Sequence, residues 1–215
     1  MGKDKLRKFR EVDSFDNVFQ LDEGLKLKGN WSDQYFKHKG PVTLELACGK
    51  GEYTVNMARL FPDRNFIGVD FKGNRIWRGA KTALEEKLDN VAFLRIRIEN
   101  ILDYFQADEV DEIWITFPDP QPQLSREKKR LTSPRFLEMY RVILKAEGSM
   151  HLKTDNAGLY LYSREQLTLS KAKTLKATDD LYRSTFVNEA LHIKTFYEQK
   201  YLAEHSPIHY LSWQF

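Results

Sequence analysis

The sequence predicts an α/β fold of the Rossmann-like type, with a mainly parallel central sheet and helices on both faces. Short β-rich runs alternate with helical segments from residue 41 onward. A glycine-containing turn follows the first run, and acidic residues follow later ones. Such alternation is typical of parallel sheets, whose ligands bind beyond the carboxyl ends of the strands.

Five strands are expected from short runs rich in β-branched and aromatic residues. They lie at 41–47, 65–70, 91–98, 112–117 and 149–154. Four helices are expected from apolar spacing, at 52–61, 74–88, 133–145 and 157–172. Pro62 closes the first helix, and Pro118 and Pro120 break the fourth strand. The C-terminal third is expected to mix short strands and loops.

The chain of 215 residues is long enough for one large domain. Residues 1–40 mix charged and aromatic side chains without strand–helix alternation. They are therefore expected to form an N-terminal arm with a short helix around 31–38. Residues 41–215 are expected to form a single domain.

Composition narrows the class of protein. Hydrophobic residues make up 41% of the chain, enough for a substantial core, and 30% charged residues argue against wholesale disorder. A single cysteine, Cys48, excludes an intramolecular disulfide and suits a reducing compartment. No apolar run approaches the roughly 18 residues of a membrane span, and no apolar stretch follows the basic N-terminus as in a signal peptide. We therefore expect a cytoplasmic protein with no membrane association.

The first strand ends in the segment Glu45-Leu46-Ala47-Cys48-Gly49-Lys50-Gly51. Glycine accepts a left-handed backbone and lets a ligand approach closely, so Gly49 and Gly51 are candidate cofactor-binding positions. A tight turn without a ligand could use the same glycines. A dinucleotide site would need a third glycine to seat a pyrophosphate, and that glycine is missing. Glu45 suits a cationic ligand better than a pyrophosphate.

Polar residues also follow the next two strands. Asp70 ends the second strand, where a carboxylate can accept ribose hydroxyls. Glu99 and Asn100 follow the third strand, where an acid and an amide could read an adenine edge. Each acid alone could be a solvated strand-end carboxylate. Three acids in phase match S-adenosylmethionine, which combines an adenosine, a positively charged sulfonium and an amino-acid tail. We therefore expect S-adenosylmethionine as the cofactor.

The segment Phe117-Pro118-Asp119-Pro120 follows the fourth strand. Its prolines stiffen the turn and would hold Asp119 at the mouth of the site. A Pro-Asp-Pro turn on its own is commonly a rigid loop, but its place beside the expected sulfonium favours a reactive role. Asp119 is thus a candidate catalytic residue and a candidate cofactor contact.

With these segments the sequence resembles the bacterial tRNA (guanine-N7-)-methyltransferase family of class I S-adenosylmethionine-dependent methyltransferases. The resemblance runs through nearly the whole chain. The matching segments are 45–51, 68–70, 117–120, 128–130, 154–155 and 195–198. The resemblance implies a class I methyltransferase domain at 41–215 and methyl transfer to N7 of a guanosine in the tRNA variable loop.

The resemblance also implies roles for individual residues. The cofactor site would be lined by Glu45, Asp70, Glu99 and Asp119, with Asp119 as the catalytic acid. The target guanosine would be contacted by Asp155, Thr195, Phe196, Tyr197 and Glu198.

Two positions depart from the family pattern. Gln121 stands where the family usually has Trp, and Gln123 stands where it usually has a substrate-contacting Lys. Arg126, Lys128 and Lys129 could replace the missing cation, which is a hypothesis.

The run Arg126-Glu127-Lys128-Lys129-Arg130 is the strongest charge signal in a chain whose net charge is +3 and whose pI is about 8.8. Such cations contact phosphates and supply affinity with little sequence information. A charge run is commonly a solvated face, but this one directly follows the reactive turn, which favours RNA. Lys128, Lys129 and Arg130 are therefore candidate tRNA contacts. The basic N-terminal arm is either a second contact or a disordered tail.

Some alternatives stay open. No metal is expected, because Pro207 between His205 and His209 opposes the helix that would pair them. The chain could be a methyltransferase for another RNA site or a small molecule, or a non-catalytic tRNA-binding protein on the same fold. The sequence does not distinguish a monomer from a homodimer.

Overall fold

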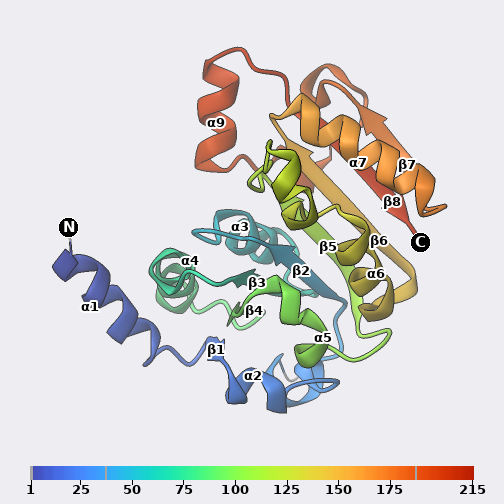
Figure 1. Cartoon of the computed structure of the whole chain (residues 1–215). Coiled ribbons are helices and arrows are strands. Elements are labelled where there is room, and N and C mark those ends of the chain that lie inside the picture. The colour runs from blue at the N-terminus through green and yellow to red at the C-terminus, as the bar shows by residue number, and fades with distance from the viewer. Residues whose placement is uncertain (1, 37, 187) are drawn as a thin grey trace.

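The computed structural model of the chain describes residues 2–36, 38–186 and 188–215. An eight-stranded sheet runs through it in the order β1-β4-β3-β2-β5-β6-β8-β7 (Figure 1). The strands are β1 (Val18–Gln20), β2 (Val42–Leu46), β3 (Asn65–Asp70), β4 (Val91–Arg95), β5 (Val110–Thr116), β6 (Leu144–Thr154), β7 (Lys173–Thr178) and β8 (His209–Gln214). The α-helices are α1 (Gly2–Val12), α2 (Asp22–Lys26), α3 (Glu52–Leu60), α4 (Gly73–Glu85), α5 (Ile101–Tyr104), α6 (Pro134–Ile143), α7 (Ala157–Leu169), α8 (Glu189–His192) and α9 (Phe196–Ala203).

The strands from β1 to β6 pair in parallel, and β8 is antiparallel to both of its neighbours, β6 and β7. The predicted Rossmann-like α/β fold is confirmed. Both β2 and β3 are buried along their whole length. In the sequence, β2 alternates apolar and polar residues and β3 contains the apolar run 66–69, and both patterns predict a strand.

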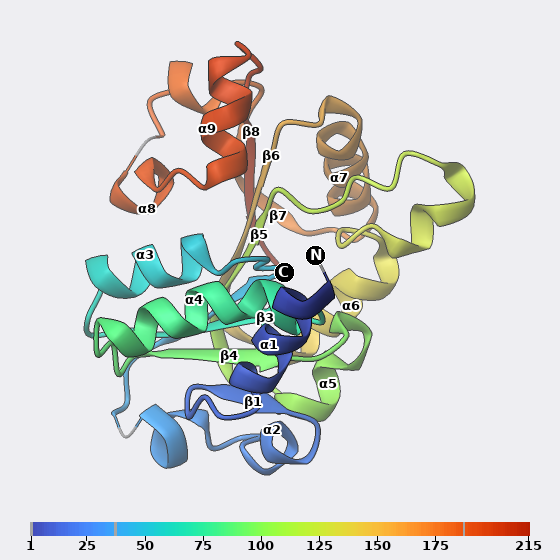
Figure 2. The same ribbon diagram turned by 90° about the vertical axis from the view of Figure 1, so that its left-hand side faces the viewer.

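Helices cover the two faces of the sheet and form a core on each. Figure 2 shows α3 and α4 on one side of the sheet and α5 and α6 on the other. Val55 of α3 and Ile76 of α4 belong to the first core, and Phe136 and Ile143 of α6 belong to the second. Full burial of such a side chain stabilises the fold by about 1.5–3 kcal/mol.

The first forty residues contain a strand that the sequence did not reveal. β1 joins the edge of the sheet beside β4, with Val18 opposite Phe93. Three residues are too few to show a periodic pattern. The short helix expected at 31–38 is a π-helix, η1 (Trp31–Phe36), and residue 37 lies outside the described residues. Its Trp31 is fully buried.

The basic N-terminal segment is the helix α1, which packs against α4. Trp77 of α4 donates from its indole Nε1 to the carboxylate of Glu11 at 2.6 Å. Arg7 and Lys8 lie 5.3 and 4.9 Å from the centre of the same ring. This segment is therefore anchored at its C-terminal half by one aromatic side chain.

Several boundaries differ from those expected. The third expected strand stops at Arg95, three residues early, and a 3-10 turn, η2 (Ile98–Asn100), follows it. The C-terminal third contains α8 and α9 besides strands and loops. Among the described residues, no helix combines the length and apolar character needed to cross a bilayer.

Candidate active site

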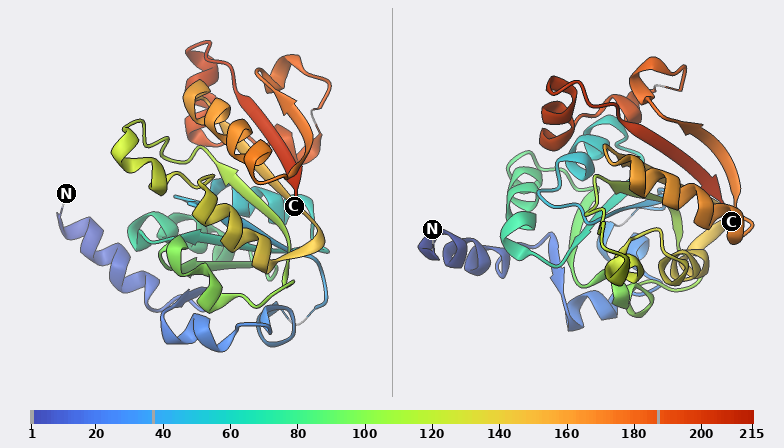
Figure 3. Two further views of the ribbon diagram at one scale, coloured as in Figure 1. Left: turned by 45° about the vertical axis from the view of Figure 1, so that its right-hand side comes forward. Right: turned by 45° about the horizontal axis from the view of Figure 1, so that its top comes forward.

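A cleft of about 590 Å³ opens at the carboxyl ends of the central parallel strands. It lies where β2 separates β3 from β5, the position at which α/β sheets bind ligands. Residues from six separate segments line it: Ala47, Asp70, Phe71, Lys72, Arg75, Ile96, Arg97, Ile98, Glu99, Phe117, Pro118, Asp119, Pro120, Gln121, Lys129, Leu131, Phe136, Tyr197 and Tyr201. Figure 3 shows the yellow-green loop after β5 and the orange-to-red segment of α8 and α9 at the same end of the sheet.

The backbone is left-handed at the ends of the two central strands. Ala47, after β2, has φ 58°, and Phe117, after β5, has φ 48°. Such conformations cost on the order of 1–3 kcal/mol at a residue other than glycine and cluster at functional sites. Gly49 and Gly51, also left-handed at 57° and 69°, complete the turn that leads into α3. The left-handed residues therefore turn the chain sharply at the end of each strand, beside the cleft.

Asp70 ties the ends of β2 and β3 together. One carboxylate oxygen accepts from the backbone N–H of Gly49 at 3.0 Å, and the other accepts from the backbone N–H of Lys72 at 2.8 Å. The side chain is buried but still borders the cleft. It is thus held rigidly at the place where the sequence predicted a cofactor contact.

Glu99 and Asn100 lie in η2 and are separated by the structure. Glu99 lines the main cleft, whereas Asn100 lines an adjoining cavity of about 380 Å³ together with Gln20 and Tyr104. Because β4 ends at Arg95, the two residues sit in a tight turn and face different cavities. The sequence had predicted that they would act as a pair.

Glu45 lies beneath the glycine turn and does not border the cleft. Its carboxylate accepts from the backbone N–H of Thr54 at 2.8 Å, from the Thr54 hydroxyl, and from the Thr116 hydroxyl at 2.6 Å. Burial raises the pKa of Glu45 to about 7, against the opposing effect of these hydrogen bonds. Glu45 therefore braces β2 against α3 and β5.

Asp119 is exposed at the rim of the cleft, in a turn that contains three prolines. Pro118, Pro120 and Pro122 have no N–H, so few donors are available in this segment. The backbone N–H of Gln121 donates to the Asp119 carboxylate at 3.0 Å. Gln121 is left-handed, with φ 44°. The turn thus holds one carboxylate oxygen and leaves the other for the cleft.

The three basic residues Lys128, Lys129 and Arg130 occupy different positions relative to the cleft. Lys129 lines the cleft, and Lys128 is exposed outside it. Arg130 turns back to the reactive turn, donating from Nε to the Gln121 carbonyl at 3.2 Å and lying 4.4 Å from the centre of the Tyr162 ring. Its guanidinium therefore supports the turn that carries Asp119.

Three cleft cations were not identified from the sequence: Lys72, Arg75 and Arg97. Lys72 and Arg75 lie three residues apart after β3 and Arg97 follows β4, so no continuous run of charge marked them. They converge only because β3 and β4 are neighbours in the sheet.

The helix α9 supplies the remaining wall. Thr195 caps it by accepting from the backbone N–H of Glu198 at 3.2 Å. Tyr197 and Tyr201 line the cleft, and the Tyr201 ring stacks at 6.0 Å on that of Phe117. Phe196 is exposed. Glu198, in contrast, is completely buried and points away from solvent toward Lys153.

Asp155 follows β6 and does not itself border the cleft. Partial burial raises its pKa. Burial, followed by the negative charge of Asp155, raises the pKa of Tyr201. Asp155 therefore lies near Tyr201, close enough for its charge to affect the Tyr201 hydroxyl.

Comparison with known proteins places this geometry in a family. A family model described as "Putative methyltransferase" matches residues 39–211. A tRNA (guanine-N(7)-)-methyltransferase of Christiangramia forsetii is 50% identical over 98% of this chain and 97% of its own length. The chain belongs to the tRNA (guanine-N7-)-methyltransferase family. Family members from Bacteroides thetaiotaomicron and Cytophaga hutchinsonii are 44% and 42% identical over 100% of this chain and over 86% and 99% of their own lengths.

Solved structures of other methyltransferases share the fold. The 16S rRNA methyltransferase KamB superposes with a TM-score of 0.65, at 15% identity over 85% of this chain and 91% of that one. A geranyl diphosphate methyltransferase superposes with a TM-score of 0.54, at 12% identity over 88% and 78% of the two chains. At such identities the likeness shows the fold alone.

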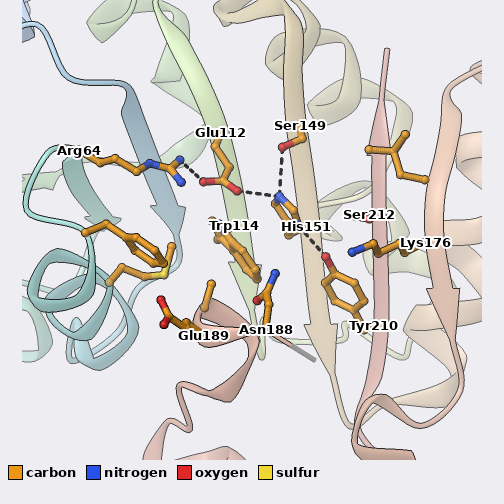
Figure 4. A pocket seen from close by; sticks show the side chains of 14 residues that line it. Arg64, Glu112, Trp114, Ser149, His151, Lys176, Asn188, Glu189, Tyr210 and Ser212 are labelled. Atoms are coloured by element: carbon orange, nitrogen blue, oxygen red, sulfur yellow. Dashed lines mark hydrogen bonds and ion pairs between the residues drawn. The ribbon is translucent and has the colours of Figure 1, made fainter. Parts of the chain in front are cut away.

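A second cavity, of about 530 Å³, has no place in the family resemblance (Figure 4). It lies on the α3 side of the sheet, where His151 Nε2 lies 2.9 Å from the Glu112 carboxylate and Arg64 contacts the same carboxylate. Burial alone would raise the pKa of Glu112, but His151 and Arg64 outweigh it and lower that pKa to about 2. The ring of His151 also stacks at 4.0 Å on Trp114. Both His151 nitrogens are engaged, because Tyr210 bonds to Nδ1 at 2.8 Å.

The described residues contain no cluster of three or more His, Cys, Asp or Glu side chains placed to hold a metal ion.

Proposed function

We propose that this protein transfers the methyl group of S-adenosylmethionine to N7 of a guanosine in the variable loop of tRNA. One observation carries the proposal: Asp70, Glu99 and Asp119 border one cleft at the carboxyl ends of β3, β4 and β5, in a chain whose full-length relatives bear this enzymatic name. Because tRNA is the proposed substrate, we also propose that the protein acts in the cytoplasm.

The residues of the cleft fit S-adenosylmethionine. Apolar side chains of Ile96, Ile98 and Leu131 border the same space as the carboxylates of Asp70 and Glu99, which suits an adenosine with polar edges. The left-handed backbone at Ala47 and Gly49 allows a close approach by a ligand. S-adenosylmethionine supplies a methyl group on a positively charged sulfur. Asp70 is the residue we assign to the ribose hydroxyls, and Glu99 to the adenine side.

Asp119 is the residue we assign to the guanine. Guanine N7 has an in-plane lone pair, so the reaction needs no strong base to expose a nucleophile. The purine gains positive charge as the methyl group arrives. A fixed carboxylate at the guanine edge accepts hydrogen bonds from N1–H and the exocyclic amine and stabilises that charge. Holding the guanine in line with the methyl group is the second contribution of the site.

The tRNA contacts we assign lie around the rim of the cleft. Lys129 borders the cleft and Lys128 lies beside it, so both can neutralise phosphates. Tyr197 borders the cleft and Phe196 is exposed next to it, so an aromatic ring is available to stack on an unpaired base. Thr195 caps the helix that carries these aromatic residues, and Asp155 lies near Tyr201.

The decisive experiment measures the product directly. An unmodified tRNA transcript with a guanosine in its variable loop is incubated with S-adenosylmethionine and the protein, and 7-methylguanosine is then quantified in the digested RNA. We expect the wild type to form it and Asp119→Ala to lose at least about 100-fold in rate. The matched control is Glu147→Ala, because Glu147 is an exposed acid near the other end of β6 and its loss leaves the rate unchanged.

The same assay separates the two alternatives. Methylation of a different nucleoside would assign the enzyme to another RNA site. Tight tRNA binding without S-adenosylmethionine binding, measured by calorimetry, would identify a non-catalytic tRNA-binding protein. The replacements at Gln121 and Gln123 are the observation that favours testing for a non-catalytic tRNA-binding protein.

A further inference from the structure

Lys153 is a buried cation that the proposed chemistry does not use. It is the penultimate residue of β6, and its side chain has no exposed surface. Successive side chains of a strand point to opposite faces, and Lys153 points toward the segment that joins α8 to α9. A buried ammonium is strongly unfavourable unless it is paired and hydrogen-bonded. The partners of Lys153 therefore explain why it is there.

The hydrogen-bond partners of Lys153 come from the end of α8 and the start of α9, and the Tyr53 ring of α3 lies 5.4 Å from its Nζ. Its Nζ donates to the carbonyl oxygens of Leu191 at 3.3 Å and Ile193 at 3.1 Å. It also pairs with the Glu198 carboxylate, at 2.7 and 2.9 Å to the two oxygens. An ammonium has three donors, and this one uses them on two backbone carbonyls and one carboxylate. The carbonyls lie at a helix C-terminus, where backbone acceptors lack partners within the helix.

Glu198 is correspondingly tied down. Its carboxylate accepts a hydrogen bond from the Tyr182 hydroxyl at 2.7 Å besides pairing with Lys153. The spacing of Thr195 and Glu198 is that of a capping box, in which the acid would turn back to the N-cap backbone N–H. Only half of that box is formed here: Thr195 accepts from Glu198, while the Glu198 side chain is diverted to Lys153. The Thr-x-x-Glu segment thus anchors the helix to the sheet.

This anchor matters because Glu198 is the one fully buried residue of α9. Tyr201 and Leu202 add only partly buried packing against the core, in the last turns of the helix. The other contacts of its first turn are peripheral: the backbone N–H of Phe196 donates to the Glu52 carboxylate at 2.7 Å, and Lys50 lies 5.0 Å from the Phe196 ring centre. Yet α9 carries Tyr197 and Tyr201, which form one wall of the cleft. The place of that wall therefore depends on the pair below it.

We propose that Lys153 is a positioning residue for the RNA substrate, which acts through Glu198 to hold α9 and its tyrosines against the cleft. Neither Lys153 nor Glu198 touches the substrate in this arrangement, and Glu198 serves as an anchor rather than as a guanosine ligand. The acids assigned to S-adenosylmethionine, Asp70 and Glu99, lie on β3 and in η2, and Asp70 is held by the backbone of Gly49 and Lys72 rather than by α9. Loss of the pair therefore affects tRNA and spares the cofactor. The inference rests on the proposed function.

The test compares Lys153→Met and Glu198→Gln with a matched control, Lys145→Met. Lys145 lies on the same strand near its other end, where it pairs with Asp111 at 2.7 Å and is half exposed. At a temperature where circular dichroism shows each variant folded, we expect Lys153→Met and Glu198→Gln to lower kcat/KM for tRNA by about tenfold to a hundredfold, as misplacement of a binding group does. The affinity for S-adenosylmethionine, measured by calorimetry, stays at the wild-type value. The control changes neither quantity.

Amide hydrogen exchange provides a readout that does not need activity. We expect faster exchange at 193–203 in both variants and unchanged exchange in β2 to β5, because only α9 is released. The proposal would be overturned if residues 193–203 of the variants exchange at the wild-type rate. It would also be overturned if the variants lose affinity for tRNA and for S-adenosylmethionine in parallel. If Lys153→Met does not fold, Glu198→Gln decides, since it keeps the side-chain volume and removes only the charge. A wild type that forms no 7-methylguanosine would refute the proposed function, while exchange and direct tRNA binding would still test the anchor.

Discussion

The carboxylate of Asp119 accepts a hydrogen bond from the backbone N–H of Gln121 at 3.0 Å. This pairing closes a short turn of the kind that Asp and Asn side chains form with the backbone two residues on. The prolines on either side of Asp119 leave Gln121 as its nearest backbone donor. Arg130 donates to the carbonyl of the same residue, Gln121, at 3.2 Å. The position of Asp119 thus depends on one hydrogen bond within the turn and on the contact of Arg130 with the same turn.

Asp119→Asn separates the turn from the charge. An amide oxygen can still accept the Gln121 N–H, so the turn is kept, but the negative charge that would stabilise the methylated guanine is lost. We expect a rate at least about 100-fold below the wild type, as for removal of a preorganised electrostatic group. Single-turnover methylation measures this rate. Wild-type turnover in Asp119→Asn would show that Asp119 shapes the turn and does not act on the guanine.

The basic residues near the cleft are expected to govern the salt dependence of tRNA binding. Arg126→Ala, Lys128→Ala and Lys129→Ala together remove three exposed cations after the reactive turn. If each contacts a phosphate, the slope of log K against log salt becomes shallower by about 2–3. Filter binding across a salt series measures the slope. An unchanged slope and affinity would refute the hypothesis that these cations replace the one missing at Gln123. Arg130 is left intact because it supports the Gln121 carbonyl.

Gly49→Ala and Gly51→Ala form a matched pair that separates backbone strain from packing. Both residues have positive φ, which costs an Ala on the order of 1–2 kcal/mol. A Cβ on Gly51 would lie 2.5 Å from the Phe93 ring, whereas one on Gly49 has no neighbour nearer than 4.0 Å. Overpacking adds about 1–3 kcal/mol at Gly51 alone.

Urea unfolding should therefore rank Gly51→Ala as clearly less stable than Gly49→Ala. At a temperature where both variants are folded, we expect Gly49→Ala to bind S-adenosylmethionine more weakly than Gly51→Ala does. The reason is that Gly49 faces the open side of the turn. Equal stabilities of the two variants would contradict the packing argument.

Glu45 is expected to make stability depend on pH. Burial raises its pKa from 4.5 to about 7 in the folded chain. A raised pKa means that the folded state holds the proton more tightly, so this contribution is fully present below pH 4.5 and is lost as the pH rises through about 7. A shift of that size corresponds to at most about 3 kcal/mol.

The comparison is the free energy of unfolding of wild type and Glu45→Gln at pH 5 and pH 8. Glu45→Gln should lose the pH-dependent difference that the wild type shows between these two values, whatever its absolute stability. Parallel pH profiles for the two proteins would show that Glu45 is not protonated in this range.

The central fold and the reactive turn could be predicted because their signals are local. The strand β2 shows alternating apolar residues and β3 a short apolar run, and each pattern lies within a few consecutive residues. The prolines after β5 mark the end of that strand and the start of a stiff turn. The edge strand β1 and the helices α8 and α9 carry no such signal, because each is short and is held by distant partners. The domain boundary at residue 40 stays a prediction, although β1 pairs with β4 across it.

The sequence by itself determined the order of the central strands and helices from β2 to β6, the turns at the strand ends, and the family to which the chain belongs. The tertiary structure alone decided which polar side chains meet. It brought Asp70, Glu99, Asp119 and Lys129 to one cleft, turned Asn100 into the next cavity, and buried Glu45 and Glu198 beneath the surfaces they were expected to form. The reason is physical: periodicity reflects the burial of neighbouring residues, whereas the direction of a polar side chain depends on where its strand stops. It depends equally on which distant donor or acceptor, such as Lys153 for Glu198, pairs with it.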